Sequence, residues 1–199
     1  GCKIWLDEDV LRLNTDSRGK YLGEFQGEDR ILVVNKNGTY YTTDYDLSNH
    51  YEEGFSVLEK YEPEKVWSAV FFDAEQQFYY LKRFRFENVV RHTLFIGETE
   101  GSYLVALSGE KRPRFEVVFG GRYESRPAEV IVADEFIAEK SYKARGKRVT
   151  TYEVKQINEI EPLDSGEEES EETASTDIDF EITNPDMLSD ETQMKLDFE

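Results

Sequence analysis

Three pairs of strand-like segments recur along the chain at nearly constant spacing, and this recurrence limits the possible folds more than any other feature. Their turns lie near Asn37, Glu75 and Lys111, which are 38 and 36 residues apart. Strand modules that recur about every 40 residues are typical of propeller-like blades. The sequence therefore predicts an all-β, propeller-like array of about three to four blades, with a β-sandwich as the structural alternative.

The clearest turn is Asn37-Gly38, which lies between apolar and aromatic segments at 31–34 and 39–43. Asn-Gly accepts the positive φ that a tight hairpin requires, so these segments are predicted to pair. A second pair is predicted from residues 66–72 and 78–86, which are rich in aromatic and β-branched side chains.

Residues 82–86 tend to alternate cations with aromatic side chains, which predicts charge on one face of the strand and rings on the other. A third hairpin is predicted from residues 103–107 and 115–119, joined by a turn at 109–113. Two further strand candidates follow at 129–132 and 149–154.

The net charge of −19 is unevenly distributed over the 199 residues. Residues 159–199 contain 16 Asp and Glu against a single Lys, whereas residues 82–155 contain 15 Lys and Arg against 11 acids. A segment so acidic cannot bury enough apolar surface to offset its ordering entropy. We therefore expect one folded domain over residues 1–158 and an acidic, largely disordered tail over 159–199.

Residues that could support catalysis or metal binding do not form recognisable sets. Cys2 is the only cysteine, and His50 and His92 have no third ligand at metal spacing. There is no P-loop and no G-x-G-x-x-G sequence. The chain is thus predicted to be non-catalytic by itself, with no metal or cofactor. The sequence has no apolar run of membrane-spanning length and no signal peptide, so we expect a cytoplasmic protein. Because the sequence begins with Gly1 and not with Met, we expect it to be a fragment of a longer protein.

Cations in the second half of the chain form three clusters, as binding to backbone phosphates requires. The clusters comprise Lys111, Arg112 and Arg114; Arg122 and Arg126; and Lys140, Lys143, Arg145, Lys147 and Arg148. The alternatives are a solvated charged face, since 34% of all residues are charged, or an all-β protein-interaction module whose basic half recognises an acidic partner.

Three segments carry a resemblance to a known family. They are Asp29–Tyr40 (DRILVVNKNGTY), Phe119–Ile131 (FGGRYESRPAEVI) and Lys140–Arg148 (KSYKARGKR). With their surroundings, over about residues 1–158, they resemble the C-terminal domain of the A subunit of bacterial type IIA topoisomerases, namely gyrase and topoisomerase IV. The resemblance implies a β-pinwheel, a propeller variant whose basic rim binds and bends duplex DNA.

Gyrase members of that family carry a basic box, Gln-Arg-Arg-Gly-Gly-Lys-Gly, which this chain lacks as such. Partial relatives occur at residues 16–20 and 144–148, and the first adds Arg18 and Lys20 to the expected DNA contacts. The departure favours a topoisomerase IV-type role in decatenation or relaxation over gyrase-type supercoiling.

The resemblance also implies that the chemistry of this ATP-dependent isomerase lies outside the chain. The catalytic tyrosine and the ATP and Mg²⁺ sites would be in the N-terminal region of the A subunit and in the B subunit. The implied partners are duplex DNA, the B subunit and the A-subunit dimer, in a nucleoid-associated complex.

The acidic tail over 159–199 suggests separate functional interpretations. Its carboxylates are expected either to compete with DNA for the basic rim or to act as a solvated solubility tail. At its end, Gln193, Leu196 and Phe198 resemble the Gln-x-x-Leu-x-Phe peptide that docks on the bacterial sliding clamp.

Overall fold

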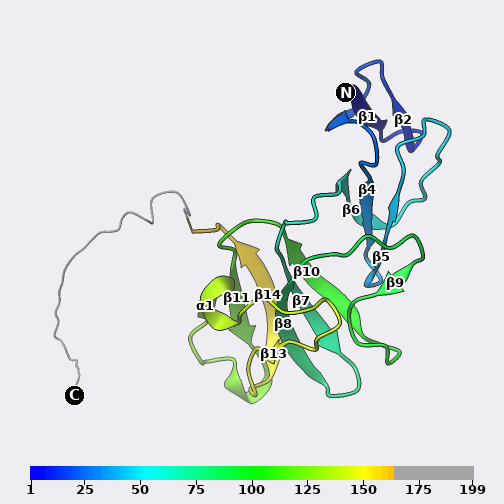
Figure 1. The fold of residues 1–199 in the computed structure, drawn as a ribbon. Helices are drawn as coiled ribbons and strands as arrows, with labels where there is room; N and C mark the ends of the chain where they lie inside the picture. The colour runs from blue at the N-terminus through cyan, green and yellow to red at the C-terminus, as the bar shows by residue number, and fades with distance from the viewer. Residues whose placement is uncertain (164–199) are drawn as a thin grey trace. The chain divides into compact units, whose positions relative to one another are not determined.

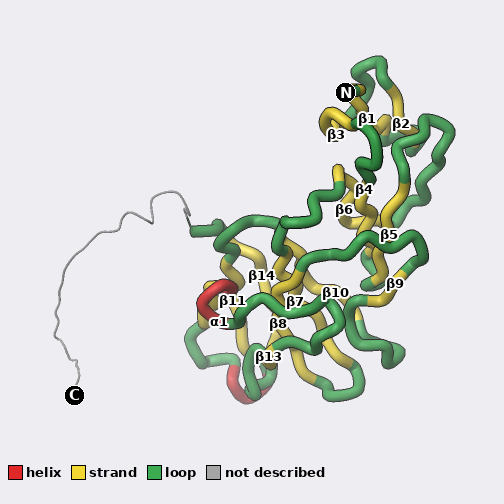
Figure 2. Tube along the Cα trace, in the orientation of Figure 1, coloured by secondary structure: helices red, strands yellow, loops and turns green. Residues whose placement is uncertain are grey.

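The computed structural model describes residues 1–163, which form fourteen short strands, one 3₁₀ turn and one short helix (Figures 1 and 2). The strands build four small sheets in which every pairing is antiparallel. The first sheet has the order β2-β1-β3, with β1 at Cys2–Asp7, β2 at Arg12–Asn14 and β3 at Lys20–Phe25.

The second sheet has the order β6-β4-β5-β9, with β4 at Ile31–Asn35, β5 at Thr39–Thr43, β6 at Phe55–Lys60 and β9 at Thr93–Leu94. The third has the order β10-β7-β8-β13, with β7 at Trp67–Asp73, β8 at Phe78–Phe84, β10 at Tyr103–Ser108 and β13 at Lys147–Arg148. The fourth has the order β12-β11-β14, with β11 at Arg114–Phe119, β12 at Glu129–Val132 and β14 at Val154–Ile160. The 3₁₀ turn η1 is Gly121–Tyr123, and the helix α1 is Ala133–Phe136.

Each inner sheet is covered on both faces, which explains its continuous apolar runs. Along β4, Ile31 and Val33 pack with the first sheet, whereas Leu32 and Val34 pack with the third. Because successive side chains point to opposite faces, a strand covered on both sides has no face turned to solvent, which favours apolar residues at successive positions. Each fully buried Val, Ile or Leu side chain contributes about 1.5–3 kcal/mol, so these runs hold neighbouring sheets together.

The third sheet repeats this arrangement. Ala69 and Phe71 of β7 belong to the cluster shared with the second sheet, and Val70 belongs to the cluster shared with the fourth. Three hydrophobic clusters therefore join the sheets in chain order, and no cluster within residues 1–163 joins the first sheet to the fourth. This all-β arrangement is consistent with the predicted propeller-like array.

Two of the three predicted hairpins are confirmed and the third is wrong. β4 pairs with β5 through the Asn37-Gly38 turn, and β7 pairs with β8. β10 and β11 form where expected but do not pair with each other. Instead β10 lies beside β7, and β11 is the central strand of the fourth sheet. The apolar pattern is the same in either pairing, so it does not distinguish a hairpin from a connection between sheets.

The strand predicted at 149–154 is also wrong. β13 ends at Arg148 and β14 begins at Val154. Between them, the backbone N–H of Tyr152 donates to Oγ1 of Thr150. Such a local side-chain acceptor favours a turn over a continued ladder, and the chain uses this turn to leave the third sheet for the fourth.

The predicted separation of charge and rings along residues 82–86 fails at Lys82. Phe84 and Phe86 are buried as expected, and Arg83 and Arg85 are more exposed. Lys82 shares the parity of Phe84 in the strand and is only 3% exposed. Its amine therefore lies on the ring face rather than in solvent.

Most of the predicted tail, including Gln193, Leu196 and Phe198, lies outside the described residues. β14 runs to Ile160, two residues into the segment that was assigned to the tail. Within residues 1–163, no helix has the length and apolar character needed to cross a membrane.

Candidate nucleic-acid interface

The third basic cluster runs antiparallel along the outer side of β8. The backbone N–H of Lys140 donates to the carbonyl of Arg83, and that of Val149 to the carbonyl of Tyr79, both at 2.8 Å. Between these points, Lys147 of β13 pairs with Leu81, while the residues before it curve away from the ladder. We call residues 140–148 the basic arch.

Two residues, the buried Tyr142 and the half-buried Gly146, fix the ends of the arch's curve. The ring of Tyr142, 5% exposed, meets the ring of Tyr40 edge-on at 5.6 Å between centroids. Gly146 has φ +96°, and a Cβ there would lie 2.6 Å from the carbonyl oxygen of Leu81. Since no other residue fits this approach, the backbone is held against β8 at Gly146 and by packing on Tyr40 of β5 at Tyr142, on either side of the exposed Lys143 and Arg145.

Four cations of the basic arch rest on aromatic rings. Cζ of Arg148 lies 3.9 Å from the ring centroid of Phe78, and Nζ of Lys147 lies 4.2 Å from that of Phe136. Two longer contacts join Arg145 to Tyr80 at 5.9 Å and Lys143 to Tyr142 at 5.8 Å.

A ring orients a cation without neutralising it. Within residues 1–163, none of these four side chains forms an ion pair with a carboxylate. All four are exposed. The basic arch therefore presents its positive charge outward from a supported position.

The second cluster follows β11, with Arg122 within η1 and Arg126 after it, and both cations lie over aromatic rings. Arg122 lies over Tyr123 at 5.4 Å, and Arg126 lies over Tyr152 at 4.0 Å. Arg126 also forms an ion pair with Glu129 at 3.3 Å, in which both side chains are partly exposed. An exposed pair of this kind is worth less than about 1 kcal/mol, so it does not keep Arg126 from exchanging Glu129 for another anion.

The first cluster contains cations in different surroundings. Nε of Arg112 lies 3.0 Å from Oδ2 of Asp134, and its Nη2 lies 2.7 Å from Oε2 of Glu135. These two ion pairs tie the guanidinium to the start of α1. Arg114 is a half-buried strand residue paired with Val132 and Ile160 in register, whereas Lys111 is exposed.

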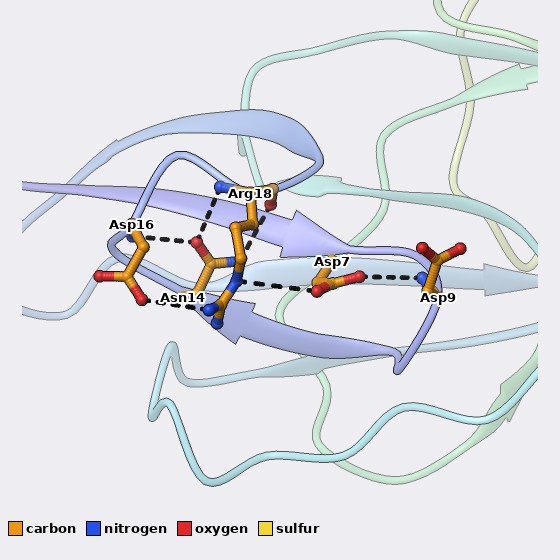
Figure 3. A network of polar contacts seen from close by, with 5 residues as sticks. All are labelled: Asp7, Asp9, Asn14, Asp16 and Arg18. Atoms are coloured by element: carbon orange, nitrogen blue, oxygen red, sulfur yellow. Dashed lines mark hydrogen bonds and ion pairs between the residues drawn. The ribbon is translucent and has the colours of Figure 1, made fainter.

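The remaining predicted cations, Arg18 and Lys20, lie in the first sheet. Oδ1 of the buried Asn14 accepts the backbone N–H groups of Asp16 and Arg18, which shapes the turn (Figure 3). Arg18 then lies 3.7 Å from Asp7 and 3.4 Å from Asp16. The two carboxylates offset its charge. Lys20 is exposed at the start of β3.

Sequence reasoning missed Lys82, whose side chain supports the basic arch from inside. Its Nζ donates to the carbonyl oxygens of Tyr142 at 2.6 Å and Ala144 at 3.1 Å, and also to the carbonyl oxygen of Phe95. Burial lowers the pKa of Lys82 from 10.5 to about 8. The parity shared with Phe84 was the available signal.

A pocket of about 460 Å³ lies beside the basic arch. Lys143 and Arg145 line one part of it, and Asp73, Glu75 and Glu98 line another. Within residues 1–163, no group of His, Cys, Asp and Glu is arranged to hold a metal ion. The pocket has mixed charge, whereas the outer side of the basic arch is cationic.

The fold and this surface define an all-β array of small sheets with a cationic edge. A family model described as "Topoisomerase C-terminal domain, Bacteroidota" matches residues 12–161, well over half of the chain. The chain therefore belongs to this family of topoisomerase C-terminal domains.

Other comparisons are more distant. A solved structure described as "Crystal structure of the C-terminal domain of DNA topoisomerase IV" is 13% identical and superposes with a TM-score of 0.44. The match covers 73% of this chain, which spans about half (52%) of that domain. Comparison with curated proteins finds no match.

Proposed function

We propose that this chain is a non-catalytic domain that binds and bends duplex DNA in the A subunit of a type IIA topoisomerase. It would present DNA for ATP-dependent strand passage, in decatenation or relaxation of the topoisomerase IV type. Membership of the topoisomerase C-terminal family supports the proposal. The observation that carries it is the basic arch, with four exposed cations on aromatic rings and no carboxylate of residues 1–163 paired to them.

The expected recognition is of phosphates rather than bases. Lys and Arg side chains that neutralise phosphates release condensed counterions, which makes binding steeply dependent on salt. Neither α1 nor η1 is long enough to act as a recognition helix in a major groove. We therefore expect little sequence preference.

Bending is energetically feasible for a surface of this kind. Bending 20–30 base pairs costs on the order of 1–6 kcal/mol. Contacts at Arg122, Arg126 and the basic arch, spread over two neighbouring sheets, could offset that cost. The partners implied by this role are the B subunit and the A-subunit dimer, in a cytoplasmic, nucleoid-associated enzyme.

The test compares two quadruple variants of the full chain that have equal net charge. One replaces Lys143, Arg145, Lys147 and Arg148 with Ala, and the control replaces Lys3, Arg12, Lys36 and Arg91, which are exposed elsewhere. Binding to 40- and 150-base-pair duplexes is titrated with salt. Loss of four phosphate contacts should reduce the salt slope by about 3–4, because each contributes roughly 0.9.

The wild-type chain should also prefer the longer duplex, since bending needs length. Equal slopes for the two variants would place the DNA contact elsewhere. If the wild-type chain binds neither duplex at low salt, the second candidate function takes precedence. That candidate is a protein-interaction module whose basic arch recognises an acidic partner, for which duplex length has no effect.

A further inference from the structure

The basic arch encloses a buried cation that cannot itself reach DNA. Lys82 projects from β8 beneath the curve of the arch, with 3% of its surface exposed. Its amine is within 5.2–5.9 Å of the ring centroids of Phe71, Phe84 and Phe95. A charge in such surroundings is costly unless its donors are satisfied.

Backbone carbonyls satisfy those donors completely. An ammonium has three N–H groups, and the carbonyl oxygens of Tyr142, Ala144 and Phe95 supply three acceptors. Two of the three belong to the basic arch, on either side of Lys143. The third follows β9, which belongs to the second sheet. A single side chain thus joins the arch to two sheets.

The carbonyls that point inward to Lys82 fix which side chains of the basic arch face solvent. Because the oxygens of Tyr142 and Ala144 are directed at a buried amine, the side chains of Lys143 and Arg145 are left exposed at the surface. Backbone hydrogen bonding joins the arch to β8 at its two ends, through Lys140 N and through β13, whereas the hydrogen bond within the curve, from Ala144 N to the Ser141 carbonyl at 3.0 Å, is short-range. Without the amine, the carbonyls of the buried Tyr142 and the half-buried Ala144 would lose this donor.

We propose that Lys82 is a positioning residue for DNA binding, which holds the backbone of the basic arch so that Lys143 and Arg145 face the phosphates. The inference rests on the proposed function, because it assigns a role to a residue beneath the same surface. Lys82 makes no contact with DNA in this scheme and acts through the arch alone.

The test uses Lys82→Met in the full chain, with Lys65→Met as its matched control. Lys65 is also partly buried and lies over a ring, that of Trp67 at 4.5 Å, but its ion pair is with Glu59, away from the arch. Both variants lose one charge. Two quantities are measured: the salt slope of DNA binding, and the rate of tryptic cleavage after Lys143 and Arg145 under native conditions.

We expect Lys82→Met to lower the salt slope by about two, the contribution of two phosphate contacts. Cleavage within the arch should become about tenfold faster, the factor expected when hydrogen bonds from a charged donor are lost. Lys65→Met should change neither quantity. A purely structural role for Lys82 would lower the melting temperature and leave the salt slope unchanged.

A folded Lys82→Met variant with wild-type slope and wild-type cleavage would overturn the inference. If that variant does not fold, the same two measurements are made on Lys82→Gln, which keeps two N–H donors on a side chain one atom shorter. This variant should show smaller changes of the salt slope and of the cleavage rate, in the same direction. The proposed function fails separately: if the wild-type chain binds no DNA, the cleavage rates still show whether Lys82 holds the arch.

Discussion

The chain contains the tripeptide Arg-Gly-Lys twice, at residues 18–20 and 145–147, and the two copies share one backbone arrangement. Gly19 has φ +88° and Gly146 has φ +96°. A Cβ at either position would lie against a carbonyl oxygen of the neighbouring strand, 2.1 Å away for Gly19 and 2.6 Å for Gly146. Each loop therefore crosses its sheet edge at a point where only glycine fits.

The register around the two copies is also the same. The lysine of each tripeptide opens an edge strand and pairs with the leucine whose carbonyl the glycine approaches, Lys20 with Leu6 and Lys147 with Leu81.

The residue that follows this leucine in the neighbouring strand differs between the two copies, and so does the sign of the charge beside the loop. After Leu6 comes Asp7, whose carboxylate lies 3.7 Å from Arg18 (Figure 3). After Leu81 comes Lys82, which binds carbonyls of the basic arch and leaves Arg145 unpaired by any carboxylate within residues 1–163. The strand residue beside the loop, together with Asp16 within the first loop, thus distinguishes a charge-neutralised copy from a cationic one.

The largest expected effect tests the shared backbone arrangement. Gly146→Ala should lower the free energy of unfolding by on the order of 4 kcal/mol, since it combines backbone strain of about 1–3 kcal/mol with a steric clash of similar cost. Gly19→Ala should cost at least as much, because its clash is closer. Urea denaturation of each variant measures both values.

Gly27→Ala is the matched control, because Gly27 has φ +59° and nothing within 4 Å of a Cβ. It isolates the cost of positive φ, roughly 1 kcal/mol. If Gly146→Ala costs no more than Gly27→Ala, the close approach to β8 does not constrain the arch.

Local features of the fold were readable from the sequence. The Asn37-Gly38 turn and the aromatic run 78–86 have signals that act over a few residues, and both hairpins formed as predicted. The actual partners of β10 and β11 could not be predicted from the sequence, because each strand pairs with a segment that is distant in the chain.

The candidate site shows the same division. The cations of the basic arch were visible as residue types, but their ring partners Phe78 and Phe136 are brought there by long-range pairing. The same is true of Arg112, whose two carboxylate partners are more than twenty residues away in the chain. Lys82 was expected on the charged face of residues 82–86; a buried lysine is uncommon, and the carbonyl partners that satisfy this one are not visible in the sequence.

The second prediction concerns the charge beside Leu81. The pKa of Lys82 falls from 10.5 to about 8 on folding. Below pH 8 both states hold the proton, whereas between pH 8 and 10.5 only the unfolded state does, so stability should rise with pH in that window. The rise is up to about 3 kcal/mol at 1.36 kcal/mol per pKa unit.

Urea denaturation at pH 7, 9 and 10.5 measures this rise as the difference between wild type and Lys82→Met. Other groups, including the buried tyrosines, titrate in both proteins and cancel in the difference. A difference that stays constant or falls across the window would mean that burial does not depress the pKa of Lys82.

The smallest expected effect concerns the first Arg-Gly-Lys loop, at residues 18–20. Asp7→Asn combined with Asp16→Asn should raise the affinity of the full chain for duplex DNA, because Arg18 loses the carboxylates that offset its charge. The amide oxygen of an asparagine at residue 7 can still accept the hydrogen bond from Asp9 N. Residue 16 shapes the loop through its backbone N–H, which donates to Asn14 and is unchanged by the substitution. The gain should be about fivefold at most, since exposed ion pairs are worth less than about 1 kcal/mol.

The control is Glu52→Gln with Glu53→Gln, which removes two exposed carboxylates from the loop before β6 and changes the net charge equally. Long-range electrostatics alone would raise the affinity of both variants by the same factor. A larger gain for the Asp7 and Asp16 variant at low salt would show that Arg18 is held back by its own carboxylates. Equal gains would mean that the first Arg-Gly-Lys loop does not reach DNA, and that the two loops differ in position as well as in charge.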